Sequence, residues 1–300
     1  MKNLKRSILA LCIFVFFNVT GQTLPEVRFN VMKDTMDTEK VSYEYLLGHK
    51  VFLREGPSKK SKKLTILDIG TKLILTDKSQ NQEAINGIRS HWYQVIVGEK
   101  KGWVWGGLIA QKALGSQANY DVKFVYGLES FKTNDEGVWE EKYQIRAFKN
   151  GIQIDKIVFD GHQFQPLEIK NIGNKGLFNV EDILTLSVSD GPDSISEGKM
   201  YVFWNNGKFT YVANLIPTVA STYTKSESFV FPSDMEGMKS TIILKTKITD
   251  YQNLENGKIT DNSSLLTSLY TWNGYKLSKK EVAPIGSNDI IVSTGNSSEL

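Results

Sequence analysis

The residues that could support catalysis are few and widely spaced. The chain has one cysteine, Cys12, and three histidines, His49, His91 and His162. A Ser-His-Asp triad needs a histidine held beside a serine on a glycine-bordered turn, and the sequence around these histidines offers no such pattern. It also contains no metalloprotease, phosphate-loop or dinucleotide-binding motif. We therefore expect no catalytic residues and no cofactor, and a protein that is not an enzyme.

Metal binding is the remaining chemical possibility. Asp190, Asp193 and Glu197 place carboxylates in one loop, and Asn171, Asn174 and Asp182 form a sparser set just before it. Calcium usually takes about six to eight oxygen ligands at close spacing, and neither set reaches that density. We predict no metal ligands, although calcium binding by the loop from Asp190 to Glu197 stays open.

Basic and aromatic residues suggest binding instead. Residues 46–112 contain 12 Lys and Arg but only five Asp and Glu, although the whole chain has a net charge of only +3. This overall charge is too small for a dedicated nucleic-acid-binding protein. The local excess indicates either a solvated turn or attraction to an anionic polymer. The candidate ligand-binding residues are Arg54, Lys59, Lys60, Lys62, Lys63, Trp92, Tyr93 and Trp105.

The N-terminal residues have the pattern of an export signal. Lys2, Lys5 and Arg6 precede an apolar stretch, Ser7–Phe17, that is too short to span a bilayer as a helix. Val19 and Gly21 have the small side chains expected before a cleavage site between Gly21 and Gln22. We expect residues 1–21 to be a signal peptide, with an uncleaved anchor as the alternative. The mature chain would then be periplasmic or extracellular, with no transmembrane span.

The secondary structure that carries these candidate residues is predicted to be almost entirely β. Residues 22–45 are polar, without sustained periodicity, and are expected to be a linker. Short β-rich runs with glycine-containing breaks follow from 46 to 112, which is typical of a small barrel. The expected strands are 51–54, 64–67, 72–76, 93–97 and 102–105, with a polar insert from 77 to 90. His91 is expected at a solvated loop end.

Residues 46–112 resemble the bacterial SH3 (SH3b) family. Arg54 followed by Gly56-Pro57-Ser58, the turn at Gly70, the strand beginning at Trp92 and the hairpin at Gly102-Trp103 occur in the order of that family. The resemblance implies an SH3-like barrel that binds cell-wall peptides or envelope proteins and has no catalytic role. The structural motif residues are Gly56, Pro57, Gly70, Gly102 and Trp103; we expect Gly70 and Gly102 at strand reversals and Trp103 in packing.

Residues 121–285 are predicted to form a larger antiparallel β domain of unknown family, followed by a polar tail, 286–300. Asn-Gly pairs at 150, 206 and 273 predict type I′ hairpins, because both residues tolerate positive φ. The chain could form a β-sandwich or a partial propeller-like arrangement. The expected strands are 122–131, 143–148, 152–158, 183–188, 200–204, 209–214, 227–231, 240–248, 268–272 and 275–278.

These features predict a secreted, non-enzymatic binding protein of the bacterial cell envelope. Its ligand would be cell-wall peptide or a protein partner. Two alternatives stay open: an accessory component or regulator of a cell-wall hydrolase, and an envelope assembly or surface protein. No nucleic-acid partner is expected, and the sequence leaves the oligomeric state undetermined.

Overall fold

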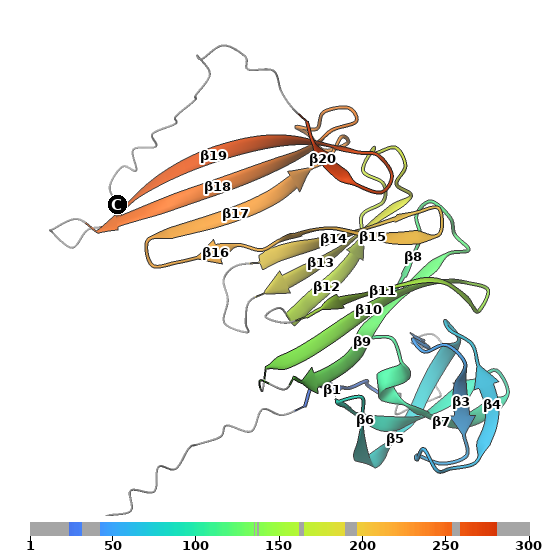
Figure 1. Cartoon of the computed structure of the whole chain (residues 1–300). Helices are drawn as coiled ribbons and strands as arrows, with labels where there is room; N and C mark the ends of the chain where they lie inside the picture. The colour runs from blue at the N-terminus through green and yellow to red at the C-terminus, as the bar shows by residue number, and fades with distance from the viewer. Residues whose placement is uncertain are drawn as a thin grey trace, which may run out of the picture.

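The computed structural model describes residues 24–31, 43–134, 136, 138–161, 165–189, 197–253 and 259–280. The predicted signal peptide with its cleavage site, most of the Asp190–Glu197 loop, His162 and the tail 286–300 lie outside these residues. The described chain is all-β: a small barrel is followed by three antiparallel sheets (Figure 1). Within the described residues, no helix has the length and apolar character needed to cross a membrane.

The barrel forms one highly curved sheet with strand order β2-β5-β6-β7-β3-β4. Its interior is apolar, with Leu53, Leu73, Tyr93, Val95 and Val104 almost completely buried. All five expected strands are present. The bounds are β1 Glu26–Val27, β2 Glu44–Tyr45, β3 Val51–Arg54, β4 Lys63–Leu67, β5 Lys72–Ile85, β6 Ile88–Val97 and β7 Lys100–Trp105, followed by the 3-10 helix η2 Gly106–Leu108.

The polar insert is a correction to the sequence prediction. Residues 77–90 extend β5 and β6 into one long hairpin, which turns at Asn86-Gly87 with φ angles of 52° and 76°. Both angles are positive, as a type I′ turn requires. This pair is a fourth Asn-Gly hairpin that the prediction missed. His91 accordingly lies within β6, half-buried, and not at a loop end.

The predicted linker is also partly structured. Val27 in β1 is buried, and β1 pairs in parallel with β6. The Ser90 hydroxyl donates to the Val27 carbonyl at 2.7 Å, and the Phe29 amide donates to the Tyr93 hydroxyl at 2.9 Å. Residues 24–31 therefore belong to the barrel. Periodicity did not reveal this strand, because a two-residue strand is too short to show any.

Three antiparallel sheets, each a meander of consecutive strands, follow the barrel. The first sheet contains β8 Lys112–Gly115, β9 Lys123–Thr133, β10 Trp139–Lys149 and β11 Ile152–Asp160. The second contains β12 Gln165–Asn171, β13 Asp182–Ser189, β14 Glu197–Asn205 and β15 Lys208–Leu215. The third contains β16 Thr218–Val219, β17 Tyr223–Val230, β18 Ile242–Asn253, β19 Ile259–Trp272 and β20 Leu277–Lys279.

Ten predicted strands correspond to strands of these sheets, but the prediction missed β8, β12, β16 and residues 259–267 of β19. The turns at Asn150-Gly151 and Asn206-Gly207 have positive φ at both residues, as expected. The third turn differs. Asn273 is not in the positive-φ region, and its amide donates to the Lys276 carbonyl at 3.3 Å, so the turn is longer than a two-residue type I′ turn.

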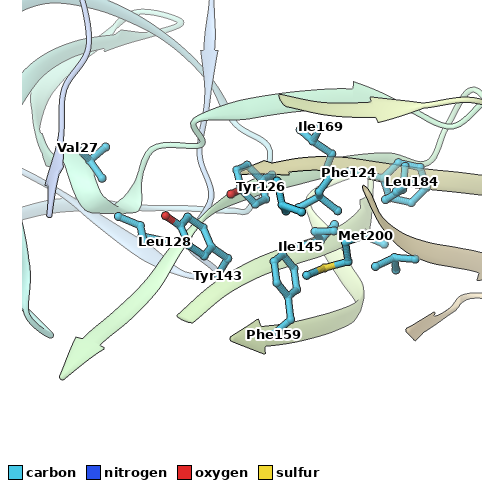
Figure 2. Packing of buried hydrophobic residues seen from close by; sticks show 14 of the residues in the cluster. Val27, Phe124, Tyr126, Leu128, Tyr143, Ile145, Phe159, Ile169, Leu184 and Met200 are labelled. Atoms are coloured by element: carbon cyan, nitrogen blue, oxygen red, sulfur yellow. The ribbon is translucent and has the colours of Figure 1, made fainter. Parts of the chain in front are cut away.

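The sheets stack face to face. Phe124, Tyr126, Tyr143, Ile145 and Phe159 of the first sheet share one apolar cluster with Ile169, Leu184 and Met200 of the second (Figure 2). The opposite face of the second sheet packs on the third through Ile183, Tyr201, Phe203, Phe229 and Ile242. A two-sheet sandwich would leave each sheet one free face. The buried middle sheet therefore favours an open stack of blade-like meanders.

Candidate binding groove

One surface groove of the barrel contains half of the predicted ligand-binding residues. It has a volume of about 280 Å³. Its walls come from the segment before β3, β3 itself, the loop after β3, the long β5–β6 hairpin, the end of β7 and η2. The lining residues are His49, Lys50, Val51, Phe52, Arg54, Lys59, Ile85, Trp92, Trp105 and Leu108.

Two tryptophans form the groove's floor. Trp92 and Trp105 face each other across the β6–β7 ladder, and each side chain is about 4% exposed. Both indole N–H groups donate to Glu83: Trp92 to a carboxylate oxygen at 2.7 Å and Trp105 to the backbone carbonyl at 3.1 Å. Because a buried indole N–H needs an acceptor, Glu83 fixes both rings. The floor is therefore rigid before any ligand arrives.

Cationic side chains form the groove's rim. The Lys59 ammonium lies 3.0 Å from the Glu83 carboxylate. The Arg54 guanidinium donates to the Ser61 carbonyl at 2.9 Å and lies 5.8 Å from the centre of the Phe52 ring, while the Lys63 ammonium lies 4.0 Å from that centre. Phe52 is thus flanked by two cations. The groove combines an apolar floor with a positively charged edge.

The predicted ligand-binding residues separate into four groups, of which the last contains only Tyr93. Arg54, Lys59, Trp92 and Trp105 line the groove, and Lys63 lies beside it, against Phe52. Lys60 and Lys62 are exposed but do not line it.

Tyr93 is a correction, because its side chain is completely buried in the barrel core and cannot contact a ligand in this structure. The alternation of strand residues places it on the opposite face from Trp92. Burial raises the pKa of its hydroxyl, which accepts the Phe29 amide.

The motif residues support the barrel locally, with one difference from expectation. Gly56-Pro57 lies in the turn after β3, and Gly70 lies in a turn with φ of 74°. Gly102 is inside β7 and not at a reversal. A Cβ there would lie 2.7 Å from both the Arg54 carbonyl and the Leu53 side chain, so glycine lets β3 approach β7. Trp103 is half-buried against the cluster that contains Trp92 and Trp105.

Sequence reasoning missed several groove residues. Phe52, Ile85 and Leu108 supply apolar walls, and Glu83 orients the floor. Two signals could have found them. Asn86-Gly87 predicts a hairpin that brings Glu83 and Ile85 beside β6, and strand alternation gives Phe52 the outward face that Arg54 shares.

The sparse set around Asp182 is held by hydrogen bonds. The buried Asp182 carboxylate accepts from the Ser116 hydroxyl at 2.5 Å, the Gln117 amide at 2.7 Å and the Asn171 side-chain amide at 2.7 Å. Its oxygens are therefore occupied by donors from neighbouring segments. Across the described residues, no group of three or more His, Cys, Asp or Glu side chains is arranged to hold a metal ion.

The comparisons with known proteins found a match only for the segment that forms the groove. No curated protein and no solved structure matches the chain. The barrel does match a family model, which covers the groove-lining strands β3, β6 and β7 and the glycine-proline turn. Residues 49–110 match the model of the bacterial SH3 domain family.

Proposed function

We propose that the groove binds an anionic peptide that inserts an apolar side chain, and that the biological ligand is a cell-wall peptide stem. One observation carries this proposal: the fold brings Arg54, Lys59, Trp92 and Trp105 together in one groove. Aromatic residues supply rigid contact area, and the cations attract carboxylates. The match to the bacterial SH3 domain, a family of binding modules, supports this reading.

The rim has positive charge available for a ligand. Within the described residues, Arg54 has no carboxylate within ion-pair distance, whereas Lys50 and Lys59 are paired with Asp68 at 3.5 Å and Glu83 at 3.0 Å. Arg54 is half-buried and held by the Ser61 carbonyl. A ligand carboxylate that reaches Arg54 would therefore meet a preorganised cation whose ordering costs little additional entropy.

The proposal includes the compartment and the absence of catalysis. The basic and apolar pattern of residues 1–21 supports export, and the sequence contains no recognisable catalytic motif. The protein would act as a non-enzymatic binding component of the envelope. Zymography on sacculi tests the absence of catalysis. No clearing is expected, and a reproducible clearing zone from the purified protein would overturn the non-enzymatic role.

Sedimentation with purified peptidoglycan sacculi tests the ligand. The double variant Arg54→Gln/Lys59→Gln should bind at least about fivefold more weakly than the unsubstituted protein at low salt, and this difference should shrink as salt screens the charges. The matched control, Lys239→Gln/Lys247→Gln, removes two exposed cations from the third sheet, one in the loop between β17 and β18 and one in β18. Equal loss in both double variants, or no binding by the unsubstituted protein, would contradict the proposed site.

The apolar part of the groove needs its own variant. Phe52→Ala removes a half-exposed ring from the wall without opening the barrel core. We expect it to weaken sacculus binding at all salt concentrations, because burial of apolar surface is not screened by ions. Unchanged binding would show that the ligand contacts only the charged rim.

A further inference from the structure

The third sheet has a long unpaired edge. Strand β19 pairs with β18 from Ile259 to Tyr270, which is most of its length. On its other side, β20 pairs only with Tyr270–Trp272, and the Lys280 amide donates to the Leu269 carbonyl at 2.8 Å. Among the residues that the structure describes, nothing pairs with this side of β19 from 259 to 268. Figure 1 shows β18 and β19 as the longest ribbons of this sheet.

The hydrogen-bonding groups on this edge follow from the ladder. In an antiparallel sheet, both backbone groups of a residue point to one side, and the side alternates along the strand. Leu269 points toward β20, because its carbonyl accepts the Lys280 amide. Thr267, Leu265, Ser263 and Asp261 therefore present their N–H and C=O groups outward. They offer a template for another strand.

The side chains on this edge do little to prevent pairing. Natural edge strands usually carry lysine, proline or bulges that block another strand. Residues 261–268 contain one charged residue, Asp261, and no lysine, arginine or proline. Leu265 and Leu266 are 63% and 55% exposed. The ladder between β18 and β19 also has no bulge.

We propose that the occupant of this edge is a second copy of the chain, paired antiparallel through β19 about a two-fold axis at Ser264. Ser264 is midway between Ile259, where β19 begins, and Leu269, where β20 starts to cover it. In this register Ser263 pairs with Leu265 of the partner subunit, and Asp261 with Thr267 of the partner subunit. No two like charges face each other, so the edge is complementary to itself.

Two other occupants fit less well. A further sheet stacked on the outer face would have to cover Lys245 and Lys247, which share that face with Leu265. The chain's own continuation past β20 would place Pro284 opposite Leu265 in the present register, and proline has no N–H to donate at that hydrogen-bonding position. The second copy has neither problem.

The expected dimer is weak. A pair of short strands buries less surface than the roughly 1,200 Å² of standard stable interfaces, so main-chain hydrogen bonds provide most of the affinity. We therefore expect a concentration-dependent equilibrium that a covalent trap reveals better than chromatography alone. The dimer leaves the barrel groove free, so its test is independent of sacculus binding.

Cysteine cross-linking tests the register. In a Cys12→Ser background, Ser264→Cys would place two cysteines at a non-hydrogen-bonded pair, with Cα atoms about 4.5 Å apart, within the range for a disulfide. Asn262→Cys is the matched control: it is exposed on the same face, but its two copies would lie roughly 13 Å apart at about 3.3 Å per residue. Under mild oxidation, we expect a covalent dimer from Ser264→Cys, with at least about fivefold less from the control.

A second substitution distinguishes cross-linking through β19 pairing from cross-linking through random collision of two copies. Leu265→Pro in the Ser264→Cys background removes an outward N–H without removing a bond to β18, so circular dichroism should stay native while the cross-linked fraction falls at least about fivefold. Equal cross-linking of the two cysteine variants, or none in either, would overturn the proposal. Undiminished cross-linking in a natively folded Leu265→Pro variant would also overturn it.

Discussion

Glu83 shows how one carboxylate organises the groove. It accepts the Trp92 indole N–H at 2.7 Å and lies 3.0 Å from the Lys59 ammonium. Its own backbone carbonyl accepts the second indole, from Trp105. The residue therefore fixes the aromatic floor and brings one cation to its edge. Because Glu83 already neutralises Lys59, the half-buried Arg54 is the stronger site for an incoming carboxylate.

Asp182 has a comparable role in stability. Its carboxylate is completely buried at the start of β13 and accepts hydrogen bonds from Ser116, Gln117 and Asn171. We predict that Asp182→Ala lowers the free energy of unfolding by about 3 kcal/mol, because it removes the acceptor of three hydrogen bonds, including that of the buried Ser116 hydroxyl. Urea denaturation measures this loss. The exposed control Asp250→Ala should stay within about 0.5 kcal/mol of the unsubstituted protein; similar losses in both variants would contradict the assignment.

At the scale of elements, turns connect the barrel to the first sheet. Gly70 lies in the turn between β4 and β5, and the Phe148 ring of β10 packs directly on it. Gly87, in the turn between β5 and β6, similarly faces the Phe131 carbonyl of β9. The Phe131 amide also donates to the Asn86 carbonyl at 2.9 Å. These turns therefore form contacts between domains as well as reversing the chain.

Two substitutions separate the energetic effect of the contact between Gly70 and Phe148 from the effect of the positive φ at Gly70. Gly70→Ala introduces a Cβ within 1.9 Å of the Phe148 ring at a φ of 74°. Gly98→Ala has a φ of 58° but meets no atom within 4 Å. We predict a loss of about 1 kcal/mol for Gly98→Ala, from the backbone alone, and at least about 2 kcal/mol more for Gly70→Ala. Thermal unfolding monitored by circular dichroism compares them, and equal losses would show that the Phe148 contact costs nothing.

At the scale of the whole molecule, aromatic clusters join successive layers. Tyr126 and Tyr143 stack with ring centres 5.7 Å apart in the cluster between the first two sheets. Tyr201 packs on Phe229 in the cluster between the second and third. Desolvation raises the pKa of all three tyrosines, and raises that of Tyr201 to about 12. Ionisation of these hydroxyls therefore destabilises the packed stack.

This predicts alkaline unfolding. The folded pKa of Tyr201 is above its ordinary value of 10.0, so its contribution is fully present below pH 10 and is lost as the pH rises toward 12. A rise of about two units corresponds to roughly 3 kcal/mol at most. Tyrosinate absorbance near 295 nm and circular dichroism should change together for the buried tyrosines. Complete tyrosine ionisation before any loss of structure would contradict this prediction.

The sequence alone determined the features that depend on local pattern. Asn-Gly pairs predicted the tight hairpins at Asn150 and Asn206 in the first two sheets, and alternating apolar residues predicted most of the strands, because both signals act between near neighbours in the chain. The motifs at Arg54, Gly56, Gly70, Trp92 and Trp103 predicted the barrel. They also supplied four of the ten groove-lining residues, since Arg54, Lys59, Trp92 and Trp105 lie within or beside these motifs.

Only the tertiary structure decided the features that depend on distant contacts. Val27 is buried because β1 meets β6, and Tyr93 is excluded from the groove because its strand face forms the barrel core. The choice of a stack over a two-sheet sandwich depends on both faces of the second sheet being buried. Periodicity shows that a strand has an apolar face but not which sheet covers it, because burial is a property of packing between segments far apart in sequence.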